Sequence, residues 1–155
     1  MRKIKILRYA IIVFMVLMSI GLLEIAFFYV FNYQDSVSFI ESQHFGKLTF
    51  YVGSFLSVLF IIGLFYTQKM LGLFSKNLCF DSKSIAVIKK AGIIFIVFSV
   101  LSMLKNIFES FPPVWSQLLD YLLNFTFLLV GFGMLSFADV LKRGNKIQEE
   151  NELTI

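Results

Sequence analysis

The chain contains four long stretches of residues that are almost free of charge, and their length restricts what it can fold into. The first, residues 9–31, contains one ionisable residue, Glu24, and the second, residues 48–67, contains no charged residue. A helix rises about 1.5 Å per residue, so about 20 apolar residues cross the hydrocarbon core of a bilayer, which is about 30 Å thick. Lipid leaves exposed backbone polar groups unsatisfied, so a single apolar stretch crosses it as a helix. We therefore expect an integral membrane protein.

The third and fourth stretches are shorter or contain polar residues. Between Lys90 and Lys105, only 14 uncharged residues, 91–104, are continuous. This segment crosses a bilayer if the lysines at its ends extend their side chains to the headgroups. The expected fold is all-α, an integral membrane four-helix bundle that forms a single membrane domain over residues 1–155. Its expected parts are spans at about 9–31, 48–67, 89–108 and 118–138, an inner loop at 68–88 and a tail at 139–155.

Local sequence predicts further details of the connections and contacts. Leu71, Leu73 and Phe74 lie among lysines of the inner loop, a pattern that favours a short interfacial helix. Asp81 and Ser82 are typical capping residues for the helix of the third span. Small residues on the second and fourth spans predict close approach of helices. They are Gly53, Ser57, Gly131 and Gly133.

The composition argues against a soluble enzyme. Hydrophobic residues make up 58% of the chain and charged residues 15%, whereas a soluble domain has about 25% charged residues to cover its surface. One histidine, His44, and one cysteine, Cys79, do not make a metal site or an intramolecular disulfide. No Ser/His/Asp set or glycine-rich phosphate loop is present. We expect a non-enzymatic protein with no cofactor and no metal.

Basic residues predict the orientation of the spans. All 14 lysines and arginines except Lys47 and Lys105 belong to the N-terminal segment, to residues 68–90 between the second and third apolar stretches, or to the tail, and such residues stay on the cytoplasmic side. Both termini are therefore expected in the cytoplasm, for a multi-pass protein of the cell membrane. Direct binding of nucleic acid is not expected, because the basic residues flank apolar runs and form no single stripe. The tyrosines and Trp115 lie near span ends, as interfacial aromatic residues do.

Glu24 is the only ionisable residue well inside an expected span. A charge at that depth costs several kcal/mol unless it is paired or hydrated, so we expect partners from the same half of the bundle. The expected intramembrane polar cluster comprises Glu24, Lys105, Asp120 and Asn124. One interpretation is a proton-coupled or ligand-binding site. The other is structural: a protonated, hydrogen-bonded glutamic acid, or a Glu24–Lys105 ion pair.

Two segments of the chain resemble a known family. The tail has the spacing Gly-x-x-Ile-Gln-x-Glu-x-Glu-Leu-Thr-Ile, and its matching residues are Gly144, Ile147, Gln148, Glu150, Leu153, Thr154 and Ile155. The inner-loop stretch 80–90 is also similar, although Cys79 stands where proline is usual and Asp81 where serine is usual. Its expected site residues are Phe80, Asp81, Lys89 and Lys90. Together they resemble a family of small bacterial four-span membrane proteins of unknown function, typically encoded beside a small Cro/CI-type helix-turn-helix regulator.

The resemblance implies a partner and not a reaction. It implies a membrane regulator or sensor. The inner loop and the tail would then engage a small helix-turn-helix regulator at the cytoplasmic face. In the tail, Gly144 would let the backbone turn away from the bilayer, and Leu153 and Ile155 would share one face if the end is extended. The alternatives are a small proton-coupled transporter that uses Glu24, a membrane protein that gives immunity to a toxin, and a tail that is merely a solvated acidic end.

Overall fold

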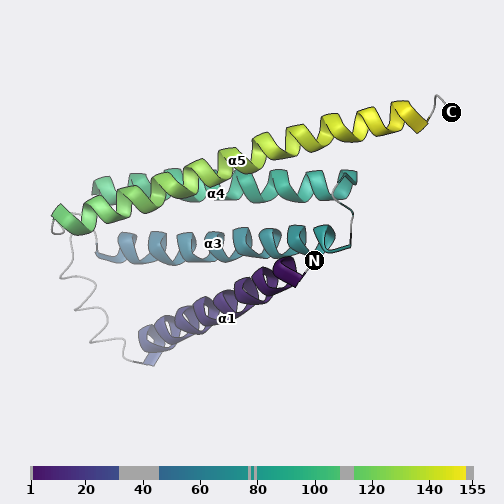
Figure 1. Ribbon diagram of the computed structural model, residues 1–155. Helices are drawn as coiled ribbons and strands as arrows, with labels where there is room; N and C mark the ends of the chain where they lie inside the picture. Colours follow the sequence, from purple (N-terminus) through teal and green to yellow (C-terminus); the bar gives the residue numbers. More distant parts are fainter. Residues whose placement is uncertain (1, 32–45, 77, 79, 109–113, 153–155) are drawn as a thin grey trace.

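The computed structural model describes residues 2–31, 46–76, 78, 80–108 and 114–152. Within these ranges the chain forms four helices and no strand (Figure 1): α1 (Arg2–Phe31), α3 (Gly46–Phe74), α4 (Ser82–Phe108) and α5 (Val114–Glu152). Each helix is long and apolar enough to cross a membrane. The prediction of an all-α bundle of four membrane helices is confirmed.

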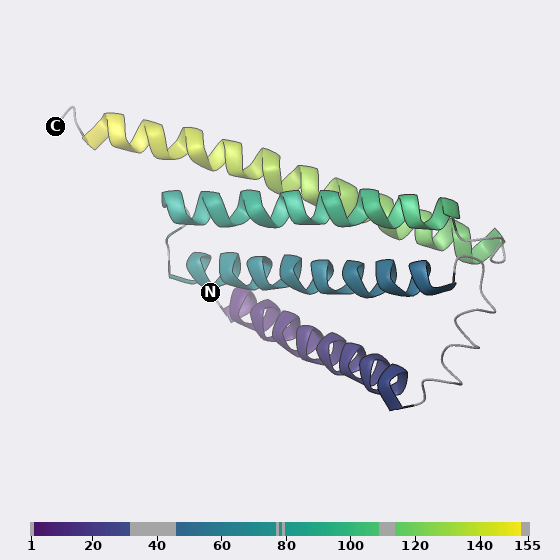
Figure 2. The same cartoon turned by 180° about the vertical axis from the view of Figure 1, so that it is seen from behind.

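The helices lie side by side in chain order, and neighbours run antiparallel (Figures 1 and 2). In the part of the chain that is described, α1 packs on α3 alone, and α4 lies between α3 and α5. The bundle is therefore open, because α1 and α5 do not close it into a ring. One end, the terminal end, gathers the start of α1, the end of α3, the start of α4 and the end of α5. The opposite end is called the loop end.

Large apolar side chains cover the outer faces of the helices. Exposed examples are Leu17, Leu23, Leu119, Leu129 and Phe132. A soluble monomer rarely exposes contiguous apolar patches of more than a few hundred Å², whereas lipid is a suitable solvent for such side chains. The exposed surface thus agrees with the four apolar helices in placing the chain in a membrane.

The closest contact between helices joins α4 to α5 at two glycines. A Cβ atom added to Gly92 would lie 2.9 Å from the backbone oxygen of Gly131, and one added to Gly131 would lie 2.8 Å from the oxygen of Gly92. Seven residues from each glycine, toward the loop end, the Ser99 hydroxyl donates a hydrogen bond of 2.5 Å to the backbone oxygen of Asn124. The close contact predicted at Gly131 is confirmed. At Gly53 and Gly133 that prediction is wrong, because nothing lies within 4 Å of an added Cβ.

Phenylalanine rings connect all four helices near the middle of the bundle. Phe60 on α3 lies 6.4 Å, between ring centroids, from Phe14 on α1 and 5.2 Å from Phe127 on α5. Its ring is also 5.1 Å from Phe98 and 6.1 Å from Phe95, both on α4. Aromatic pairs at these distances add about 0.5–1.5 kcal/mol to the free energy of burial. Phe60 therefore links α1 to the aromatic part of the core.

The helices extend beyond the expected spans at the terminal end. α3 continues to Phe74 and α4 begins at Ser82, so the inner loop expected at 68–88 shrinks to the connection 75–81. The separate interfacial helix expected there is wrong. Its residues belong to the last turns of α3 because Phe74 packs on a buried cluster of Ile85, Ile88, Ala138 and Leu141. Tertiary packing of this kind extends a helix that local sequence would end.

The capping prediction for α4 is confirmed. The Asp81 side chain accepts a hydrogen bond of 3.1 Å from the backbone N–H of Lys83, and α4 begins at Ser82. An aspartate in this position satisfies one of the N–H groups that the first turn of a helix leaves without a partner. The cap sets where α4 starts and therefore where Phe80, just before it, is presented.

Candidate functional site

The two segments that resemble the family meet at the terminal end of the molecule. Phe80, in the connection before α4, lies against Gly144 on α5: a Cβ atom added to Gly144 would be 2.8 Å from the Cε1 atom of the Phe80 ring. Glycine at this position gives the ring room to approach the α5 backbone. Gly144 was expected to turn the chain away from the bilayer, and this expectation is wrong, since α5 continues as a helix to Glu152.

A second contact between the same segments is ionic. The Lys89 ammonium on α4 lies 2.9 Å from a carboxylate oxygen of Asp139 on α5, and both side chains are partly exposed, at 40% and 63%. An ion pair with that much exposure stabilises the fold by about 0–1 kcal/mol. It adds a second contact between α4 and α5 near the place where Phe80 meets Gly144. Phe80, Lys89, Asp139 and Gly144 together are called the joint surface.

A well-packed base supports the joint surface. Ile88 and Ala138 are fully buried, and Met70, Phe74 and Met134 pack around them. The buried Ser84 donates a hydrogen bond from its hydroxyl to the backbone oxygen of Leu78, which holds the connection against α4. The surface is therefore presented by a fixed arrangement of α3, α4 and α5, in contrast to the free tail that the sequence suggested.

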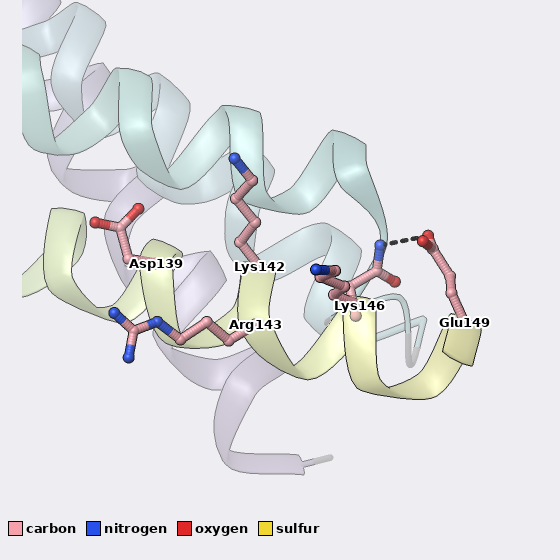
Figure 3. Close-up of a pocket in the computed structure, with 6 residues that line it drawn as sticks. Asp139, Lys142, Arg143, Lys146 and Glu149 are labelled. Atoms are coloured by element: carbon pink, nitrogen blue, oxygen red, sulfur yellow. Dashed lines mark hydrogen bonds between the residues drawn. The ribbon is translucent and has the colours of Figure 1, made fainter. Parts of the chain in front are cut away.

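Beyond the joint surface, α5 continues as a helix with charges of both signs (Figure 3). Lys146 lies 3.6 Å from Glu150, and the Asn145 side chain donates a hydrogen bond of 2.9 Å to Glu149, each pair one helical turn apart. Ile147 is 59% exposed among these polar residues. An open hollow of about 630 Å³ follows this part of α5. It is lined by Asp139, Lys142, Arg143, Asn145, Lys146 and Glu149.

Other residues predicted for this site have separate positions. Asp81 caps α4, and the Lys90 ammonium lies 5.9 Å from the centre of the Tyr66 ring, so it faces α3 and not α5. Gln148 and Glu150 are exposed on α5 and each makes interactions within the chain. Leu153, Thr154 and Ile155 lie outside the described residues. No role was predicted for Asp139, whose one local signal in the sequence is an acidic residue close to Lys142 and Arg143.

The predicted intramembrane polar cluster is spread over three helices. Asn124 is buried between α4 and α5, Asp120 is exposed one turn away on α5, and Lys105 is half-buried near the end of α4. Glu24 is exposed on α1, which packs on α3 alone in the described part of the chain. The role of Glu24 stays a prediction. Among the residues that are described, no three His, Cys, Asp or Glu side chains gather as ligands of a metal would.

These features place the chain in a class and in a family. Four antiparallel apolar helices, each long enough to cross a bilayer, define a multi-pass membrane protein. The chain belongs to the DUF2975 family of proteins of unknown function, whose sequence pattern matches residues 7–155. The match includes all four helices and both segments of the joint surface. No curated protein and no solved structure matches the chain.

Proposed function

We propose that the protein is a non-enzymatic regulator or sensor of the bacterial cell membrane that docks a small cytosolic protein at its terminal end. The observation that supports this most strongly is the contact of Phe80 with Gly144. It combines two segments, far apart in the sequence, into one surface. A single partner could therefore reach both segments at the same end of the bundle.

The length of α5 supports a docking role. Its 39 residues correspond to about 58 Å of helix, whereas the hydrocarbon core of a bilayer is about 30 Å thick. Figures 1 and 2 show α5 continuing past the first turn of α4. Its last turns therefore project from the bundle, where a cytosolic partner could reach them.

The chemistry of the projecting helix indicates what kind of partner it suits. Ile147 is exposed between pairs of opposite charge. Covering an aliphatic side chain of that size stabilises a complex by about 1.5–3 kcal/mol, while charged groups at the rim select partners more than they add affinity. The partner we propose is the small helix-turn-helix regulator that the family resemblance implies. That regulator, and not this chain, would contact DNA.

The proposal is tested by co-purification from membranes. The full-length chain, an Ile147→Glu variant and a chain that lacks residues 149–155 are each pulled down, and the helix-turn-helix protein encoded beside the gene is quantified. We expect both variants to lose that protein while their expression and melting temperature in detergent stay unchanged. Leu129→Ala, at an exposed position within the apolar part of α5, is the matched control and should retain it. Equal recovery with all the variants would refute the docking role.

A further inference from the structure

A second open hollow lies between the helices, in the half of the bundle nearer the loop end. It has a volume of about 440 Å³ and receives side chains from all four helices. Its lining residues are Met18, Gly53, Leu56, Ser57, Phe60, Phe98, Ser102, Lys105 and Phe127. The openness of the bundle explains the space, because α1 packs on α3 but does not cover the other helices.

The floor of this hollow is aromatic and fixed. The rings of Phe60, Phe98 and Phe127 lie in mutual contact, with centroids 5.1, 5.2 and 5.6 Å apart. Three rings from three helices constrain one another, so the floor does not collapse into the space above it. An acyl chain that moves from the lipid onto these rings would leave one apolar environment for another. The fit between the chain and the shape of the hollow would therefore decide how tightly it binds.

The polar groups lie toward one side of the hollow. Lys105 is in the last turn of α4, so it is nearer the loop end than the phenylalanine floor, and Ser102 precedes it by one turn. The Ser57 hydroxyl donates to the backbone oxygen of Gly53 and so presents only its lone pairs. Lys105 already has an interaction within the chain, but an ammonium has three N–H donors and can bind a further acceptor.

We propose that this hollow binds one acyl chain that carries a carboxylate, with the chain on the phenylalanines and the carboxylate at Lys105. The position of the hollow within the apolar part of the bundle favours a ligand that enters from the bilayer. A volume of about 440 Å³ falls within the roughly 300–1,000 Å³ of small-molecule sites and suits one chain better than a two-chain phospholipid. A single cation matches a single negative charge. This site does not depend on the docking role proposed above.

The test uses the purified full-length protein in nanodiscs of phosphatidylcholine. The probe is a long-chain fatty acid with a photoreactive diazirine in its chain, and labelled peptides are identified by mass spectrometry. We expect labelling on the α3, α4 and α5 peptides that carry the three rings. Unlabelled oleate should compete at least tenfold better than oleyl alcohol, because a hydrogen bond between charged groups is worth at least the roughly 1.4 kcal/mol that corresponds to tenfold. Phosphatidylglycerol should compete no better than the alcohol.

Two pairs of variants locate the site. Gly53→Leu adds a side chain where the backbone leaves room and should fill the hollow and abolish labelling. Gly133→Leu, at an equally open glycine on the exposed surface of α5, should not. Lys105→Gln should weaken competition by oleate about tenfold, whereas Lys47→Gln should not. Labelling that is spread evenly over the lipid-facing residues, or that survives Gly53→Leu, would overturn the site. Equal competition by phosphatidylglycerol would overturn the single-chain ligand.

Discussion

Gly144 shows how one missing side chain joins two distant parts of the chain. From the sequence, Gly144 was predicted to let the backbone turn, because glycine tolerates backbone conformations that other residues avoid. In the structure the glycine is helical, and what it provides is space for the ring of Phe80. Sequence alone could not distinguish these two uses of glycine, since the difference depends on a residue more than 60 positions away.

The first prediction is that Gly144→Ala weakens docking without weakening the fold. Alanine stabilises a helix by about 0.5–1 kcal/mol over glycine, but its Cβ atom would lie 2.8 Å from the Phe80 ring, so the ring must move. We expect an unchanged or slightly raised melting temperature in detergent together with reduced recovery of the cytosolic partner. Gly133→Ala, which meets nothing within 4 Å, is the control and should keep full recovery. Undiminished binding by Gly144→Ala would show that the Phe80 contact plays no part in docking.

The second prediction concerns Glu24, which is exposed on α1. Glu24→Gln should leave expression and stability in detergent unchanged, because a neutral amide retains hydrogen bonding and removes any charge that lipid would disfavour. Glu24→Lys should lower both, since it places a cation on an exposed position of α1, where lipid disfavours a charge. If glutamine proves as damaging as lysine, the ionised carboxylate is required, and a proton-coupled role would become the better account of the protein.

At the scale of the helices, the sequence predicted which segments span but not where the helices end. The four apolar stretches identify four helices because lipid permits no other backbone structure for a single segment. Asp81 predicted the start of α4 correctly because a cap is a local interaction. The end of α3 was missed because Phe74 packs on residues of α4 and α5, and no local pattern reports that contact.

At the site, too, local features were predicted, whereas contacts between segments far apart in the sequence were missed. Phe80 and Gly144 were singled out by resemblance, but their contact depends on how α5 crosses α4. So does the pairing of Lys89 with Asp139, a residue to which the sequence assigned no role. Gly53, expected to let helices approach, borders an open hollow instead. Small residues indicate that a helix face leaves space beside its backbone. Whether a neighbouring helix fills that space depends on how the helices pack.

The third prediction tests the crossing of α4 and α5. Gly131→Ala would place a Cβ atom 2.7 Å from Ile96 and 2.8 Å from the backbone oxygen of Gly92, and the backbone cannot move aside as a flexible side chain can. Overpacking of this kind costs about 1–3 kcal/mol. We expect a lower melting temperature in detergent and, because the crossing positions the joint surface, weaker docking. Gly133→Ala, two residues along the same helix, should cause neither effect. Equal stability of both variants would contradict the close contact.

For the whole molecule, the antiparallel order of the helices gathers nearly all the basic segments at the terminal end, leaving Lys47 and Lys105 at the loop end. Basic residues stay on the cytoplasmic side, so the last prediction is that the terminal end, with the joint surface, faces the cytosol.

In a Cys79→Ser background, cysteines replace Ser42, between α1 and α3, and Gln148, exposed on α5. An impermeant thiol reagent applied to intact cells should label the cysteine at Ser42 and not the one at Gln148. After the cells are opened, it should label both, which shows that the second cysteine is reactive. The reverse pattern would place the joint surface outside the cell and exclude a cytosolic partner. Labelling of both in intact cells would require an even number of spans between them, so one of the three helices α3, α4 and α5 would have to fail to cross.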